Sequence, residues 1–147
     1  MPPVEQHMGV PPERVWEILA DPATYAHWVV GSRSVERWDP DWPAPGTRFH
    51  HTQGRRPVII HDHTESIAAE APRHLEMVAY ARPFLVARVI LDVRPEAGGC
   101  RVGMEEIAIG GLFGPLLKLP PNTQLTKLRN KESLKRIRQL AEGKKDG

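Results

Sequence analysis

The sequence predicts an α+β fold in which one face of an antiparallel β-sheet is covered by a long C-terminal helix. Residues 74–81, 87–94 and 100–105 alternate between apolar and polar side chains, which is typical of strands with one buried and one wet face. From about residue 123 to 141 the spacing is helical, and no other segment is long enough to cover the sheet. We therefore expect a single α+β domain over residues 1–147.

The N-terminal region is predicted to form a short strand at 4–10 and then two short helices that meet at a corner. The first helix carries its aliphatic side chains on one side. Asp21 ends this helix and can cap the next one, which has Pro22 at its first position. We expect the corner to close one end of the sheet, with at least one of Trp16 and Trp28 largely buried.

Turn-forming residues divide the next part of the chain into three further strands. We expect these strands at 34–38, 47–53 and 58–68. A loop rich in proline and glycine separates the first two strands, and a turn centred on Arg55 and Arg56 separates the last two. The sequence therefore predicts a meander of antiparallel strands before the final helix.

The hairpin formed around this turn carries four histidines. The predicted register places His50 opposite His61 and Arg48 opposite His63, all on one face. Imidazoles at His-x-His spacing on a strand could hold a metal ion. However, Arg48 occupies the same patch, and no carboxylate is placed to complete a ligand set. We therefore predict a solvated patch that holds no metal.

Three other ionisable residues are candidates for the interior of the domain. His51 and Asp62 lie on the more apolar face of the hairpin, and Glu106 continues the inward series of its strand. An inward carboxylate could act as a general acid or base. The glycines at 110–111 favour the alternative, in which the strand bends near Glu105 and Glu106 and both carboxylates reach water.

The final helix carries the clearest signal for a ligand. At about 100° per residue, one broad side holds Thr126, Asn130, Ser133, Leu134, Ile137, Leu140 and Ala141. The C-terminal half of this side is apolar, whereas the N-terminal half is small and polar. Buried polar groups need partners, which a ligand or ordered water in a cavity would supply. Hydrogen bonds to the sheet or to the connector at 112–119 are the alternative. Leu125 and Leu128 lie off this side, so the connector or a second subunit of a homodimer would have to cover them.

Composition and charge limit the classes of function. The 147 residues are 40% apolar and carry a formal net charge of +2, so we expect no nucleic-acid partner. Eight Lys or Arg follow Thr123 against three acidic residues, which we interpret as a solvated helix face and a basic tail from about residue 142. Cys100 is the only cysteine, which excludes an internal disulfide and a zinc finger. Without a signal-peptide pattern or a long apolar run, the expectation is a cytoplasmic protein with no stable membrane insertion.

Several short segments carry a resemblance to a known superfamily. They are Pro12–Trp16, Leu19–Pro22 with Tyr25 and Trp28, Pro45–Phe49, Glu70–Leu75 and Gly98–Val102. In these segments and in the order of its elements, the chain resembles the helix-grip superfamily, which includes START lipid-transfer domains, birch-pollen-allergen-like proteins and polyketide cyclases. The resemblance implies a curved antiparallel sheet wrapped around the C-terminal helix, with a cavity between them that binds lipids, sterols, hormones or polyketides.

The fold alone does not select a function, because related domains carry unrelated activities. The first hypothesis is a binding module that holds a small, mostly apolar, lipid-like or polyketide-like molecule between sheet and helix, with no cofactor. The second is a polyketide cyclase or dehydratase that uses Glu106, His51 or Asp62 as acid or base. The third is an interaction protein with a filled core. The residues predicted to line the cavity are Trp28, Phe49, His51, Asp62, Met77, Val89, Met104, Glu106, Thr126, Asn130 and Ser133.

Overall fold

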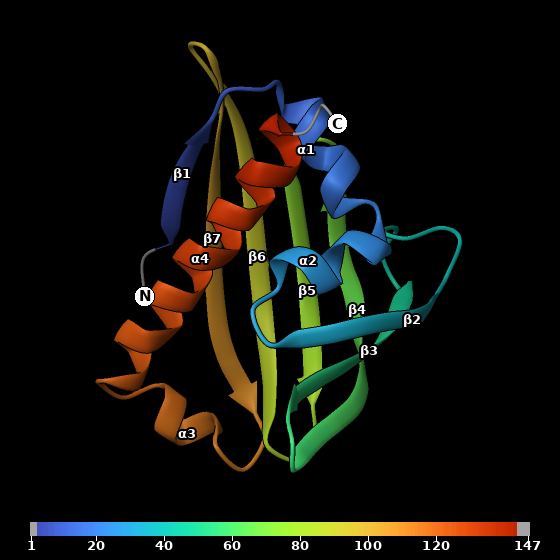
Figure 1. The fold of residues 1–147 in the computed structure, drawn as a ribbon, viewed down its shortest axis with the longest axis vertical. Helices are drawn as coiled ribbons and strands as arrows, with labels where there is room; N and C mark the ends of the chain where they lie inside the picture. The colour runs from blue at the N-terminus through green and yellow to red at the C-terminus, as the bar shows by residue number, and fades with distance from the viewer. Residues whose placement is uncertain (1–2, 144–147) are drawn as a thin grey trace.

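The alternating and helical segments of the sequence form one antiparallel sheet with helices on a single face (Figure 1). The computed structural model describes residues 3–143. In chain order the elements are β1 (Val4–Met8), α1 (Pro12–Leu19), the 3-10 helix η1 (Pro22–Thr24), α2 (Tyr25–Trp28), β2 (Ser32–Trp38), β3 (Arg48–Arg55), β4 (Val58–Glu70), β5 (His74–Ala81), β6 (Leu85–Glu96), β7 (Gly99–Gly110), α3 (Gly114–Leu117) and α4 (Asn122–Glu142).

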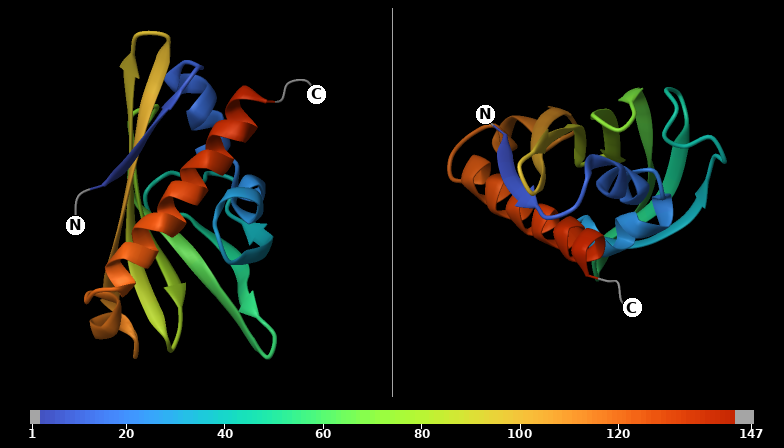
Figure 2. Two further views of the ribbon diagram at one scale, coloured as in Figure 1. Left: turned by 60° about the vertical axis from the view of Figure 1, so that its left-hand side comes forward. Right: turned by 90° about the horizontal axis from the view of Figure 1, so that it is seen from above.

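Within residues 3–143, the seven strands are ordered β1-β7-β6-β5-β4-β3-β2 and are antiparallel throughout. Strands β2 to β7 each pair with their neighbours in sequence, and β1 joins the edge beside β7. Figure 2 shows α4 crossing the inner face of the curved sheet, with α1 and α2 on the same side. The predicted fold class, with short helices after the first strand and a long C-terminal helix against the sheet, is confirmed.

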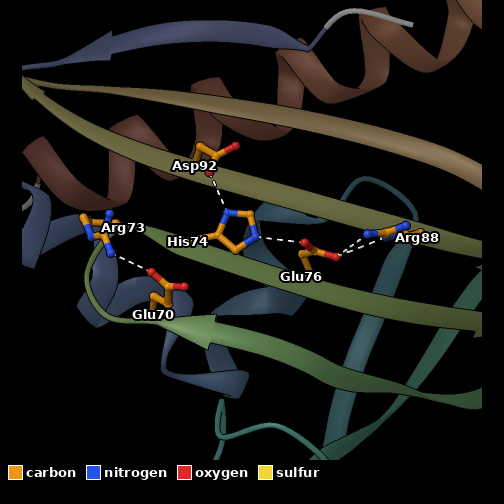
Figure 3. A network of polar contacts seen from close by, with 6 residues as sticks. All are labelled: Glu70, Arg73, His74, Glu76, Arg88 and Asp92. Carbon is orange, nitrogen blue, oxygen red and sulfur yellow. Dashed lines mark hydrogen bonds and ion pairs between the residues drawn. The ribbon is translucent and has the colours of Figure 1, made fainter.

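The alternation in the sequence separates the two faces of the sheet as predicted. Leu75 and Met77 of β5 are buried in the same core as Ile137 of α4. On the opposite face, His74 contacts both Asp92 and Glu76, and Arg88 donates to Glu76 (Figure 3). Arg73 and Glu70 form a separate pair beside them. The Nδ1 atom of His74 lies 2.6 Å from Oδ1 of Asp92, and Arg88 Nη2 donates to Glu76 Oε2 at 2.6 Å.

The N-terminal corner is built by the residues that predicted it. The Asp21 side chain accepts a hydrogen bond of 3.1 Å from the backbone N–H of Ala23 and so caps η1. Trp28 is fully buried, and Trp16 is half-buried against the core. The prediction that at least one of these two tryptophans is largely buried is confirmed.

The predicted register of the β3–β4 hairpin is wrong by two residues. His50 lies opposite His63, and Arg48 lies opposite Glu65. The turn is formed by Arg56 and Pro57, one position beyond the predicted centre, and moving the centre by one residue shifts every cross-strand partner by two. Because side chains alternate with a period of two, each residue keeps its predicted face.

The predicted bend in β7 is also absent. β7 stays paired with β6 through Glu105 and Glu106, and the ladder shifts only at Val86 and Ala87, close to the end of the strand. The glycines at 110–111 therefore end the strand without bending it earlier. Glu106 keeps the inward direction of its strand and borders the interior.

The connector at 112–119 does not cover the outer side of α4, which was one of the two arrangements expected for Leu125 and Leu128. Leu125 and Leu128 are 58% and 60% exposed, so the connector that contains α3 does not cover them. Leu116 and Leu119 of that connector are exposed as well.

No helix within residues 3–143 has the length and hydropathy to span a bilayer. Most of the predicted basic tail lies outside the described residues.

Candidate ligand-binding site

A pocket of about 260 Å³ lies between the sheet and the middle of α4. Its walls come from α2 and the segment that follows it, from the inner faces of β3 to β7, and from α4. Nine of the residues predicted for a cavity line it: Trp28, Phe49, His51, Met77, Val89, Met104, Glu106, Asn130 and Ser133. The structure thus brings together side chains from six different elements around one space.

The space results from a gradient of side-chain size along β5 and β6. The facing pairs on the inner side are Leu75 with Leu91, Met77 with Val89, and Ala79 with Ala87. Larger side chains fill the interior near α1, whereas the methyl groups of the alanines leave room below α4. The alternation of apolar and polar residues in the sequence predicts which side chains face inward. The decrease in side-chain size from the leucine pair to the alanine pair indicates where along the strands the pocket lies.

Aromatic side chains form the wall near α2. Tyr25 contacts the rings of Trp28, Trp42 and Phe49, with ring centroids 4.5, 5.9 and 4.7 Å away. Burial raises the pKa of the Tyr25 phenol, and its hydroxyl donates a hydrogen bond of 2.7 Å to the Leu19 carbonyl. Trp28 and Phe49 present ring surface to the pocket. This wall is rigid and apolar, which suits a hydrophobic ligand.

His51 is the most unusual polar group of the pocket. Its side chain projects from β3 beside Phe49 and is only 2% exposed. Burial lowers the pKa of His51, although the backbone of His63 and the charge of Asp62 oppose this shift. Within residues 3–143, neither ring nitrogen has a partner in hydrogen-bonding geometry. The ring is therefore neutral near pH 7 and keeps one donor and one acceptor unused.

Glu106 faces the pocket but is held by a cation. Its side chain is 14% exposed, and Arg129 of α4 donates to Glu106 Oε2 at 2.8 Å. This pair joins β7 to the helix across one border of the pocket. Asn130, directly after Arg129 in the chain, and Ser133, one turn further along α4, are both buried, and neither forms a side-chain hydrogen bond with the described residues.

Two predicted residues lie outside the lining. Asp62 binds Arg82, whose backbone N–H, Nε and Nη2 lie 3.0, 3.1 and 2.8 Å from its carboxylate oxygens. Burial alone would raise the pKa of Asp62, but hydrogen bonds from Arg82 and from the His63 backbone lower it to about 2. The hydroxyl of Thr126 donates to the Asn122 carbonyl at 3.0 Å. Both side chains thus have partners within the protein.

The remaining histidines of the hairpin lie on the outer face, in a second, polar hollow. His63 stacks at a tilt on Tyr80, and His61 Nδ1 lies 3.0 Å from the Thr52 hydroxyl. Burial and the charge of Arg48 lower the pKa of His63. No group of three or more His, Cys, Asp or Glu side chains within the described part of the chain could hold a metal ion. The absence of a bound metal stays a prediction.

The sequence matches one family model over almost its whole length. Residues 4–142 match the family described as "Polyketide cyclase / dehydrase and lipid transport". The chain belongs to this family. The match also confirms the resemblance to the helix-grip superfamily that the sequence motifs carried. Among curated proteins, none matches the chain.

Solved structures of the same fold are similar over nearly their full length. Protein CV1439 from Chromobacterium violaceum superposes with a TM-score of 0.71 at 15% identity, covering 97% of both chains. Protein NE0264 from Nitrosomonas europaea gives a TM-score of 0.72 at 15% identity, covering 99% of this chain and 96% of its own. Ara h 8.0201 gives 0.71 at 14% identity, with 95% of each chain covered. At these identities the similarity establishes the fold of the family member described here, and the function has to be argued from its pocket.

Proposed function

We propose that this protein binds a small, mostly apolar molecule, lipid-like or polyketide-like, in the pocket between its sheet and α4. The observation that carries the proposal is the pocket of about 260 Å³, whose walls are largely apolar. They also include the buried side chains of His51, Asn130 and Ser133, which form no hydrogen bond within residues 3–143. Apolar walls with a few convergent polar groups are typical of small-molecule sites. The membership of the chain in a cyclase and lipid-transport family supports the same function.

The alternative is an enzyme of the cyclase or dehydratase type, with Glu106, His51 or Asp62 as acid or base. Two of these residues are occupied: Glu106 is paired with Arg129, and Asp62 is held by Arg82. Of the three candidates, only His51 has side-chain polar atoms without a hydrogen-bonding partner within residues 3–143, and its ring lines the pocket. A single free imidazole lacks the second group that an acid–base pair needs, which favours binding over catalysis.

Binding is tested with the neutral fluorophore N-phenyl-1-naphthylamine. We expect a Kd in the micromolar range, on the order of 8 kcal/mol, measured as an increase in its fluorescence. Asn130→Leu should weaken binding about tenfold or more, because the larger apolar side chain occupies part of the pocket. The fold should persist, since Asn130 makes no side-chain hydrogen bond that the substitution would break within the described residues.

Gln124→Leu provides a matched control, because Gln124 lies on the same helix with an exposed side chain. This control should bind the fluorophore as the wild type does. Equal binding by wild type and Asn130→Leu would contradict the proposed site. No binding by the wild type would leave the interaction protein with a closed interior as the better description.

A further inference from the structure

His51 is an exception within the aromatic wall of the pocket. Trp28 Nε1 donates to the Thr24 hydroxyl at 3.3 Å, and Trp42 Nε1 donates to the Leu19 carbonyl at 3.1 Å. The hydroxyl of Tyr25 also has a partner. Among the residues that the structure describes, the two ring nitrogens of His51 are the only fully buried side-chain polar atoms left without a hydrogen bond. Buried polar groups almost always have a hydrogen-bonding partner, so two buried ring nitrogens without one call for an explanation.

Among the described residues of the sheet, none is in hydrogen-bonding geometry with the His51 ring, although the backbone of His63 lies close enough to raise its pKa. Asp62 lies directly opposite across the β3–β4 ladder, but Arg82 and the backbone N–H of His63 occupy its carboxylate. On its own strand the ring of Phe49 meets the imidazole edge to face, with centroids 5.9 Å apart. The partner must therefore come from one of the two spaces that the imidazole borders, the apolar pocket and the polar outer hollow. Of these two, the pocket is the one with largely apolar walls.

The charges around the pocket indicate what kind of molecule can enter. Among the described residues that line it, only Glu106 and Arg129 are charged, and they neutralise each other through a contact of 2.8 Å. Burial keeps the His51 imidazole neutral by lowering its pKa. A charged ligand would lose its hydration without gaining a free counter-ion, which is strongly unfavourable.

We propose that the pocket selects neutral molecules that carry a hydroxyl or carbonyl group, and that His51 hydrogen-bonds to this group. The inference rests on the proposed function and specifies the ligand class. A neutral imidazole has one N–H donor and one nitrogen acceptor, so a hydroxyl fits either tautomer and a carbonyl fits the N–H. Asn130 and Ser133 on α4 provide polar contacts for a second such group on the far side of the ligand.

The test compares three probes of similar size: 2-naphthol, 2-methylnaphthalene and 2-naphthoate. Their dissociation constants are measured by quenching of tryptophan fluorescence for the wild type and for His51→Phe. We expect the ratio of 2-naphthol to 2-methylnaphthalene affinity to fall about tenfold in His51→Phe, because one hydrogen bond is lost while the apolar contacts remain. The wild type should bind 2-naphthoate more weakly than 2-naphthol.

His50→Phe is the matched control, because His50 is adjacent on β3 and faces the outer hollow. In this variant the ratio should stay at the wild-type value. His51→Gln, which retains a donor and an acceptor, should preserve most of the preference for 2-naphthol and replaces His51→Phe if the latter does not fold.

Two results would overturn the inference while leaving the proposed function intact. One is an unchanged ratio in His51→Phe, which would mean that ordered water or the outer hollow satisfies the imidazole. The other is binding of 2-naphthoate as tightly as 2-naphthol, which would exclude selection for neutral ligands. If none of the probes binds to the wild type, the proposed function itself fails.

Discussion

The interior between the sheet and α4 has two ends that share one backbone architecture but differ in their side chains. At the closed end, beside α1, Leu134, Ile137 and Ala141 of α4 pack into a core that includes Leu75 and Leu91. At the pocket end, Asn130 and Ser133 of the same helix face Met77, Val89 and the alanine pair of β5 and β6. Large side chains at one end hold the helix on the sheet, and small or polar ones at the other leave room for a ligand. The comparison shows how one helix can serve both stability and binding.

The largest expected effect separates the two ends by stability. Ile137 is fully buried at the closed end, and Ile137→Ala should lower the free energy of unfolding by about 2–5 kcal/mol. The loss arises from the removed apolar contacts and from the cavity that they leave. Urea denaturation measures the change, and a loss below about 1 kcal/mol would show that the closed end is not the tightly packed region.

A cavity-filling substitution on the sheet tests the same difference in packing between the closed end and the pocket end. Ala87→Leu adds bulk to the pocket end, where we expect a cost below about 1 kcal/mol, since overpacking a filled core typically costs about 1–3 kcal/mol. Ala141→Leu, at the closed end, is the matched control and should show the larger cost. Equal destabilisation in urea denaturation would mean that the pocket end is filled by its own side chains.

The smallest expected effect concerns the outer face, which contributes to stability without contacting the pocket. Hydrogen bonds to Asp92 and Glu76 raise the pKa of His74 above its usual 6.5, so the folded protein binds this proton more tightly than the unfolded chain does. This stabilisation is fully present below pH 6.5 and is lost as the pH rises through the raised value. His74→Gln should therefore cost most at low pH, by less than about 1 kcal/mol because the network is partly exposed.

The measurement is the free energy of unfolding of wild type and His74→Gln from pH 5.5 to 9. The difference between the two proteins should shrink as the pH rises. Glu76 has the opposite dependence: its hydrogen bonds from His74 and Arg88 lower its pKa, and their contribution is lost as the pH falls through that lowered value. A difference between the two proteins that grows with pH would contradict the assignment of the His74 proton.

The sequence predicts most of the fold because local signals agree with tertiary packing. Alternation defined the strands, the Asp21–Pro22 signal defined the corner, and the stripe of α4 identified its buried side. The hairpin register was missed because it depends on which residues form the turn, and a shift of two leaves every face unchanged. The ion pairs could not be predicted from the sequence. Arg82 binds Asp62 and Arg129 binds Glu106 because separate elements bring these side chains together in space.

If a ligand enters the pocket end and leaves the closed end untouched, the methyl groups of the methionines at the two ends will respond differently. Within the described residues, Met77 and Met104 line the pocket, whereas Met8 is buried in the core outside it. We would follow the ¹³C-methyl NMR signals of methionine during titration with N-phenyl-1-naphthylamine. We expect saturable shifts for Met77 and Met104 and an unchanged signal for Met8. Shifts of equal size for all three methyl groups, or none for Met77 and Met104, would contradict it.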